Sequence, residues 1–229
     1  MASQGTAPTA RETAEAAAAL GRVLSSGQAG LLAGYLGLLG KWNRKMNLVG
    51  PGDWRHILET LIADSWHVAD LLSEEPVRGL FPEDGAFSIL DFGAGAGLPG
   101  IPLRMFWPRG RYHFIEARAK RAIFLRQALA ELRLDNASVF EGRAERFLAE
   151  EADRERFTLF LSRAFMPWPD FLSLARAASF TTYAALVMTG EEPRPELAPQ
   201  GLSRLAMTSY RAGGKERYAS VFIPVSEAR

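Results

Sequence analysis

The sequence predicts an α/β fold in which a mostly parallel, doubly wound sheet follows a helical cap and ends in an antiparallel hairpin. Short β-rich runs alternate with helical segments over residues 88–188, which is typical of parallel sheets with crossover helices. The residues before this region have the apolar spacing of helices. Two apolar segments near the C-terminus flank the turn-forming sequence Arg211-Ala212-Gly213-Gly214, which indicates a hairpin.

The N-terminal third of the sequence predicts a helical cap. Residues 1–10 are small and polar, and we expect them to be disordered. Helical propensity and apolar periodicity then define three helices, at residues 12–24, 28–42 and 54–72. We therefore divide the chain into a cap over residues 11–80 and one sheet domain over residues 81–229.

The sheet domain begins after a loop at residues 73–86, and its elements then alternate. The strands are expected at residues 88–92, 112–116, 137–141, 157–162 and 184–188. The helices between them are expected at residues 98–107, 120–132, 146–154 and 168–179. Two hairpin strands are expected at residues 202–210 and 218–225. Strict alternation of this kind predicts a Rossmann-like sheet.

The composition excludes several kinds of site. The chain has no cysteine, so it has no disulfides and no thiolate metal ligands, and its three histidines lack metal-ligand spacing. We expect no metal, and neither a membrane span nor a secretory signal is indicated. A cytoplasmic monomer is the expectation. The net charge of +1 does not indicate a nucleic-acid partner, for which the distribution of charge matters more than its total.

A glycine-rich loop after the first strand is the strongest indication of a binding site. The strand ends at Asp91, and Gly93, Gly95, Gly97 and Gly100 follow, where open α/β sheets bind nucleotides. The loop contains the G-x-G-x-x-G pattern of dinucleotide sites and also the longer D-x-G-x-G-x-G pattern of S-adenosylmethionine sites. A carboxylate at Asp91 would repel a pyrophosphate and attract the methionine amine by ~1 kcal/mol even at high dielectric. The sequence therefore favours S-adenosylmethionine.

Two later segments are placed to complete a cofactor site. Glu116 ends the second strand, where a carboxylate accepts hydrogen bonds from ribose hydroxyls in both cofactor classes, although it could also be a solvated helix cap. The run Gly142-Arg143-Ala144-Glu145 follows the third strand and is placed beside an adenine edge. Glu145 is equally suited to the first turn of a helix.

Several longer motifs resemble one bacterial family, the small-subunit ribosomal RNA guanine-N7 methyltransferases known as RsmG or GidB. The resemblance spans roughly residues 28–190, in the family's order. It rests on Lys41-Trp42-Asn43-Arg44-Lys45-Met46-Asn47-Leu48, Asp64-Ser65, Leu98-Pro99-Gly100-Ile101-Pro102-Leu103, Lys120-Arg121-Ala122-Ile123-Phe124-Leu125-Arg126 and Ser162-Arg163-Ala164-Phe165. It implies a class I methyltransferase that uses S-adenosylmethionine to methylate N7 of one guanine in the 530 loop of 16S ribosomal RNA (guanine-527 in family usage).

The resemblance also implies roles for individual residues. The implied cofactor contacts are Gly93, Leu98, Glu116, Ala144, Glu145 and Arg163; the loop pattern adds Asp91, Gly95 and Gly97. Three positions depart from the family, because Thr60, Leu61 and Thr189 stand where members usually have Arg, His and Lys. Basic residues are lost there, which puts RNA binding rather than cofactor binding in question. One of the nearby residues His56 and His67 could compensate, although a lone histidine is more often a surface or packing residue.

Methylation of guanine N7 needs alignment rather than acid–base chemistry. N7 has an in-plane lone pair and no proton, so the protein has only to hold the base about 3 Å from the methyl group. The residues expected to align it are Arg163, Ser162, Asp64 and Ser65. The residues expected to bind the RNA are Ser162, Arg163, Phe165, Lys120, Arg121 and Arg126. Phe165 either stacks on the base or packs in the core.

Basic residues also cluster around the first two crossovers, where they form either a phosphate-binding patch or an ordinary solvated face. They are Arg104, Arg109, Arg111, Arg118, Lys120, Arg121 and Arg126. Trp42, with basic residues beside it, continues the apolar stripe of its helix and is expected to pack.

The expected partner is 16S ribosomal RNA or the small ribosomal subunit, and three alternatives stay open. A nicotinamide-dependent oxidoreductase would use the shorter glycine pattern but would tolerate Asp91 poorly. A methyltransferase acting on a protein or small molecule would explain the missing basic residues. A degenerate family member would bind RNA without turnover, although the intact glycine loop argues against it.

Overall fold

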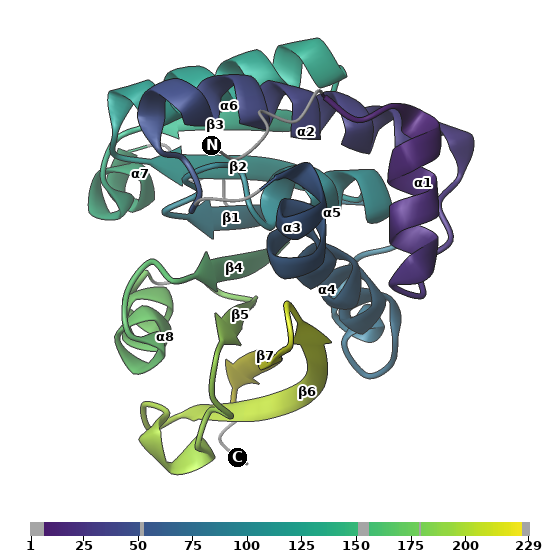
Figure 1. The fold of residues 1–229 in the computed structure, drawn as a ribbon. Coiled ribbons are helices and arrows are strands. Elements are labelled where there is room, and N and C mark those ends of the chain that lie inside the picture. The colour runs from purple at the N-terminus through teal and green to yellow at the C-terminus, as the bar shows by residue number, and fades with distance from the viewer. Residues whose placement is uncertain (1–6, 51–52, 151–155, 179, 226–229) are drawn as a thin grey trace.

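The computed structural model describes residues 7–50, 53–150, 156–178 and 180–225, and it forms one seven-stranded sheet. The strand order is β3-β2-β1-β4-β5-β7-β6, which Figure 1 shows from top to bottom. The strands are β1 (Phe87–Phe92), β2 (Arg111–Glu116), β3 (Ala137–Glu141), β4 (Phe157–Arg163), β5 (Tyr183–Thr189), β6 (Leu202–Ala212) and β7 (Lys215–Pro224). Strands β1 to β5 are parallel and β7 is antiparallel to both its neighbours, which confirms the expected fold class.

Helices cover both faces of the parallel part of the sheet (Figure 1). The crossover helices are α5 (Gly100–Phe106), α6 (Ala119–Leu132), α7 (Ala144–Glu150) and α8 (Trp168–Ala177). Successive side chains of a strand point to opposite faces, so Ile89 of β1 packs in the apolar cluster under α5 and α6, while Leu90 packs in the cluster under α7 and α8. The predicted helix at residues 146–154 ends in a segment outside the described residues, and so does the last residue of the predicted helix at 168–179.

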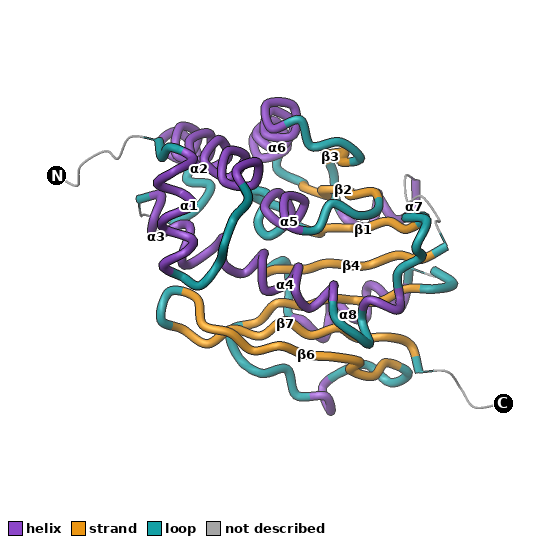
Figure 2. The backbone as a smooth tube through the Cα atoms, turned by 90° about the vertical axis from the view of Figure 1, so that its right-hand side faces the viewer, coloured by secondary structure: helices purple, strands orange, loops and turns teal. Residues whose placement is uncertain are grey.

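The helical cap packs against the α5 and α6 side of the sheet (Figure 2). It consists of α1 (Ala10–Ala19), α2 (Ser26–Met46), α3 (Trp54–Ile57), the π-helix η1 (Leu58–Ile62), α4 (Ala63–Ser73) and the 3-10 helix η2 (Arg78–Leu80). A further 3-10 helix, η3 (Pro195–Leu197), precedes β6. Helix α2 lies along α6, where the ring of Trp42 meets that of Phe124 edge-on at 5.8 Å. Trp42 therefore packs, as its place in the apolar stripe predicts.

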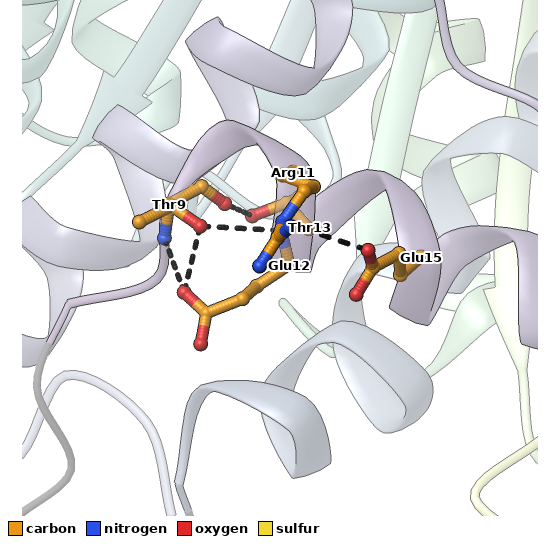
Figure 3. Close-up of polar contacts among 5 residues, drawn as sticks. All are labelled: Thr9, Arg11, Glu12, Thr13 and Glu15. Atoms are coloured by element: carbon orange, nitrogen blue, oxygen red, sulfur yellow. Dashed lines mark hydrogen bonds and ion pairs between the residues drawn. The ribbon is translucent and has the colours of Figure 1, made fainter.

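Helix α1 starts earlier than its composition alone predicts because a capping box fixes its first turn (Figure 3). The Thr9 hydroxyl accepts a hydrogen bond from the Glu12 amide at 3.2 Å, and the Glu12 carboxylate accepts one from the Thr9 amide at 2.8 Å. The hydrogen bonds that the Thr9 amide and, at 2.7 Å, the Thr9 hydroxyl donate to the Glu12 carboxylate hold the pKa of Glu12 below its usual value. The disorder expected over residues 1–10 falls largely on residues outside the description, and Pro8 and Thr9 are part of the packed chain.

The C-terminal hairpin has a tighter turn than the predicted one. Arg211 and Ala212 belong to β6, which leaves Gly213 and Gly214 as a two-residue turn with φ of 58° and 73°. Positive φ at both positions is typical of type I′ turns, which match the twist of the strands they join. A Cβ at Gly213 would collide with Thr60 of η1, so the tip of the hairpin touches the cap closely.

No helix in the described part of the chain is both long enough and apolar enough to cross a membrane.

Candidate cofactor and substrate site

A cavity lies where the carboxyl ends of the parallel strands meet. Its volume is about 380 Å³, within the range of roughly 300–1,000 Å³ that is common for small-molecule sites. The lining comes from the loops after β1, β2, β3 and β4: Gly93, Ile115, Glu116, Ala117, Arg118, Arg121, Gly142, Arg143, Ala144, Glu145, Ala164 and Phe165. Strand β1 lies between β2 and β4 at the point where the chain reverses direction through the sheet, which is where such folds bind ligands.

The glycine loop passes close to this cavity with little room for side chains. Gly93 has φ of 68°, and a Cβ there would lie 2.6 Å from a ring carbon of Phe165. Gly97 has φ of 78°, and a Cβ there would collide with Ile101 of α5. Gly93 therefore keeps the cavity wall thin, whereas Gly97 allows the loop to pack on its own helix.

Two buried hydroxyl groups of the cap hold the loop in place. The Tyr35 hydroxyl of α2 donates to the Ala96 carbonyl at 2.7 Å, and the Ser65 hydroxyl of α4 donates to the Pro99 carbonyl at 3.0 Å. Burial raises the pKa of Tyr35, so it remains a donor at any physiological pH. The cap thus positions the glycine loop directly.

We expect Tyr35→Phe to loosen the loop because the buried Ala96 carbonyl would lose its partner. The expected cost is about 1–2 kcal/mol in the free energy of unfolding, measured by urea titration. Tyr218→Phe is the control, since that side chain lies on the outer hairpin and should cost less than about 0.5 kcal/mol. Equal losses in the two variants would contradict the role of Tyr35.

Glu116 is the buried acidic residue of the cavity lining, whereas Glu145 is exposed. Glu116 is only 4% exposed, and its two carboxylate oxygens accept hydrogen bonds from the Gly95 amide at 2.9 Å and the Arg118 amide at 2.8 Å. These bonds tie the glycine loop to the connection between β2 and α6. A carboxylate can accept about four hydrogen bonds, so Glu116 retains capacity for a ligand's hydroxyl groups.

Asp91 occupies a different place from the one its sequence position suggests. It is 1% exposed, outside the cavity lining, and accepts a hydrogen bond from the Tyr112 hydroxyl at 3.0 Å. Burial raises the pKa of Asp91 to about 8, against the opposing effects of Tyr112 and Arg163. At neutral pH the carboxyl is therefore mainly protonated. This differs from the expectation of a charged group at the mouth of the loop.

Two of the four expected alignment residues, Arg163 and Asp64, form a largely buried ion pair at the end of β4. Arg163 Nη2 lies 2.8 Å from Asp64 Oδ2, and the two side chains are 21% and 3% exposed. Burial raises the pKa of Asp64, while Arg163 and then the Tyr210 hydroxyl oppose this. Ser162 is buried nearby in β4 and Ser65 follows Asp64 in α4. Asp64 therefore holds Arg163, and Arg163 is the more accessible partner.

The structure separates the other predicted site residues into distinct groups. Gly93, Glu116, Ala144 and Glu145 line the cavity, as does Phe165, whose ring centroid also lies 6.1 Å from that of Phe92 in the core. Phe165 therefore lies between the core and the cavity, and its stacking on a base stays a prediction. Gly95 touches the site through Glu116, while Gly97, Leu98 and Arg163 lie outside the lining.

The basic cluster predicted around the first two crossovers is not one patch. Arg104 is buried and donates to the carbonyls of Arg109, Gly110 and Asp135. Arg109 donates to the Pro82 carbonyl, and Arg126 pairs with Glu141 at 2.9 Å. Arg118, Lys120 and Arg121 remain near the site, where they line a second cavity.

The three positions that depart from the family pattern have local roles. Thr60 donates to the His56 carbonyl at 2.6 Å, Thr189 donates to the Glu191 carbonyl at 2.7 Å, and Leu61 packs against the core. Burial lowers the pKa of His67, which stacks on Tyr210, so His67 does not replace a lost cation.

Sequence reasoning missed a cation and several contacts at this edge. Arg217 of β7 lies beside the end of β5, with Nη1 3.5 Å from the position of a Cβ on Gly190, and its charge acts on Asp64. The buried hydrogen bonds of Tyr35 to the Ala96 carbonyl and of Tyr210 to Asp64 were not predicted either. Their only signal in the sequence is a hydroxyl within an apolar segment, which needs a partner when buried.

A family model described as GidB, rRNA small subunit methyltransferase G, matches residues 28–208. The chain belongs to this family. The matched region contains the glycine loop, the cavity, the Arg163–Asp64 pair and most of β6.

Relatives in the GidB family support the assignment over most of the chain. A protein named ribosomal RNA small subunit methyltransferase G from Nitratidesulfovibrio vulgaris is 44% identical over 193 residues, covering 83% of this chain and 84% of the relative. The protein of the same name from Oleidesulfovibrio alaskensis is 40% identical, covering 80% of each chain. Membership of this family favours a methyltransferase over the oxidoreductase alternative.

A solved structure shares the fold at much lower sequence similarity. The putative methyltransferase yhhF from Escherichia coli is 16% identical, with a TM-score of 0.50, over 70% of this chain and 88% of that chain. This likeness shows that the two chains share a fold. The fold and the family together imply use of S-adenosylmethionine.

Proposed function

We propose that the chain transfers a methyl group from S-adenosylmethionine to N7 of a guanine in the 530 loop of 16S ribosomal RNA (guanine-527 in family usage), in the cytoplasm. The observation that carries this proposal is the cavity with Glu116 enclosed at its edge, in a chain of the GidB family. The names of the relatives support the small-subunit RNA as substrate.

The residues of the cavity fit S-adenosylmethionine in size and chemistry. Glu116 would accept hydrogen bonds from the ribose hydroxyls, and Ala144 and Glu145 would lie along the adenine. The thin wall at Gly93 leaves room for the methionine part beside Phe165. When bound, the cofactor supplies an electrophilic methyl group on a sulfonium.

The protein's contribution to transfer would be alignment. Among the described residues that line the cavity, the only acids are Glu116 and Glu145 and there is no histidine, which suits a nucleophile that has no proton to lose. Arg163, held by Asp64, would donate to the guanine edge or to a neighbouring phosphate. Phe165 would pack against the base on the opposite side from the core.

The decisive experiment maps N7-methylguanosine in small-subunit RNA by mass spectrometry, in cells with and without the protein. We expect the modification at one guanine to disappear without the protein and to return with the parent sequence. Purified small subunits, naked RNA, proteins and metabolites are then compared as methyl acceptors with the purified enzyme. An unchanged N7-methylguanosine signal would reject the RNA substrate, and methylation of a protein or metabolite alone would favour the alternative.

A further inference from the structure

A second cavity lies next to the cofactor cavity, between the end of α2 and the start of α6. Its volume is about 530 Å³, and its lining residues are Lys45, Met46, Asn47, Arg118, Ala119, Lys120 and Arg121. We refer to these residues as the basic groove. Four of the seven side chains are cationic and none is acidic, so the groove has a strongly positive potential.

These cations are not engaged in ion pairs. Lys45, Arg118 and Lys120 are exposed and Arg121 is half-buried, and none of the four has a carboxylate of the described chain within ion-pair distance. Other basic residues differ in this respect, since Arg22 pairs with Asp70 at 2.8 Å. Charges left unpaired on both walls of a groove favour an anionic ligand.

The start of α6 adds to this preference. Its N-cap is Arg118, which makes no side-chain capping hydrogen bond. The Arg118 amide itself donates to the Glu116 carboxylate at 2.8 Å, so only the amides that follow it, which have no side-chain cap, favour an anion at this end of the 14-residue helix. Lys45, from the last turn of α2, supplies the opposite wall from a distant part of the sequence.

The groove borders the cofactor cavity, because Arg118 and Arg121 line both. A nucleic-acid strand that presents one base to the cofactor must place the phosphates on either side of that base close to the cofactor cavity. Two helices with cations on both walls suit a backbone with several phosphates better than a single small anion.

We propose that the basic groove binds the phosphate backbone of the RNA strand that carries the target guanine. This inference rests on the proposed function and adds the path of the strand, from the cofactor cavity between α2 and α6. Of the basic cluster predicted from sequence, Arg118, Lys120 and Arg121 serve this role and Lys45 joins them. Arg104, Arg109 and Arg126 do not, since they are engaged elsewhere.

The test measures the salt dependence of RNA binding by the double variant Lys45→Gln/Lys120→Gln. The probe is a fluorescent single-stranded RNA with the sequence of the small-subunit loop, titrated between about 50 and 200 mM salt. Loss of two phosphate contacts should reduce the slope of log affinity against log salt by about 1.4 and weaken binding roughly tenfold. The cofactor affinity and the melting temperature should stay unchanged, because both lysines are exposed and neither lines the cofactor cavity.

Lys215→Gln is the matched control, because Lys215 is an exposed lysine at the start of β7, outside the groove. Its salt slope should equal that of the parent. An unchanged slope in the double variant would overturn the proposal. Vesicles of phosphatidylglycerol serve as a second anionic probe: if the double variant loses binding to the vesicles while its RNA binding stays intact, the proposal is also overturned. Mapping of N7-methylguanosine tests the proposed function separately. If the parent enzyme methylates this guanine and the double variant keeps the parent's salt slope, only the role of the basic groove is rejected.

Discussion

Replacing Glu116 with Gln is expected to weaken S-adenosylmethionine binding by about 10- to 100-fold. The parent carboxylate would bond the ribose hydroxyls while it holds the Gly95 and Arg118 amides. Gln presents an NH2 group in place of one oxygen, so a backbone amide or a ribose hydroxyl loses its acceptor. A lost charged hydrogen bond costs roughly 1.5–3 kcal/mol, and more when a buried donor is left unpaired. Isothermal titration calorimetry with S-adenosylhomocysteine measures the effect without methyl transfer.

Glu141→Gln provides the matched control for this variant. Glu141 ends β3 in direct register with Glu116, but it is exposed and lies outside the cavity lining. Its variant should bind within about threefold of the parent, because exposed ion pairs contribute at most about 1 kcal/mol. If Glu116→Gln also binds within threefold, Glu116 is not a cofactor ligand.

The variant Asp91→Asn is expected to be more stable than the parent at alkaline pH. The pKa of Asp91 is about 8 in the folded chain and 3.8 as a free side chain. Between these values the folded chain keeps a proton that the unfolded chain has released, so the parent loses stability as pH rises from about 4 to 8. The difference of about four pKa units corresponds to roughly 5 kcal/mol. Asn cannot ionise and still accepts from Tyr112, so it avoids this loss.

Urea unfolding of the two ligand-free proteins at pH 5, 7 and 9 measures the effect. The stability of Asp91→Asn relative to the parent should increase at each step in pH. The exposed Asp135→Asn controls for simple loss of a negative charge. A difference between Asp91→Asn and the parent that is the same at pH 5 and pH 9 would show that Asp91 is ionised in the folded chain.

The same variant tests the cofactor role that the sequence predicts for Asp91. If the carboxyl group meets the methionine amine, Asp91→Asn weakens S-adenosylmethionine binding while it stabilises the ligand-free protein. Opposite effects on affinity and stability are common where a site keeps a group in an unfavourable environment. Under the same condition, Asp91→Ala should abolish methylation, which a methyl-transfer assay on small-subunit RNA measures.

Most of the fold could be predicted from local pattern. The five parallel strands were located within one residue at each end, because buried strands are short apolar runs bounded by glycine or charge. The helix predicted at residues 98–107 was too long, since Gly97 and Pro99 delay its start to Gly100. The predicted helix at residues 12–24 ends instead at Ala19, just before Gly21 with φ of 84°.

The candidate site could be predicted where its residues lie at or just after the ends of parallel strands. Gly93, Glu116 and Ala144 follow strand ends, so parallel topology brings them to one edge. The ionisation of Asp91 depends on Tyr112 and on burial, neither of which a linear motif records. The predicted basic cluster was misleading for a similar reason. Arg104 and Lys120 come from the same region of the sequence, but Arg104 is buried against backbone carbonyls and Lys120 lines the basic groove.

The contact between the C-terminal hairpin and the helical cap affects the order in which parts of the chain can fold during synthesis. Tyr210 stacks on His67 and hydrogen-bonds Asp64, so β6 completes a polar cluster that α4 begins. A nascent chain whose hairpin is still inside the ribosomal exit tunnel can form the glycine loop and Glu116, but it lacks Tyr210 and Arg217. The surroundings of the Asp64–Arg163 pair are therefore completed only after the hairpin has emerged, and under the proposed function we expect competence for methyl transfer to arise at that point.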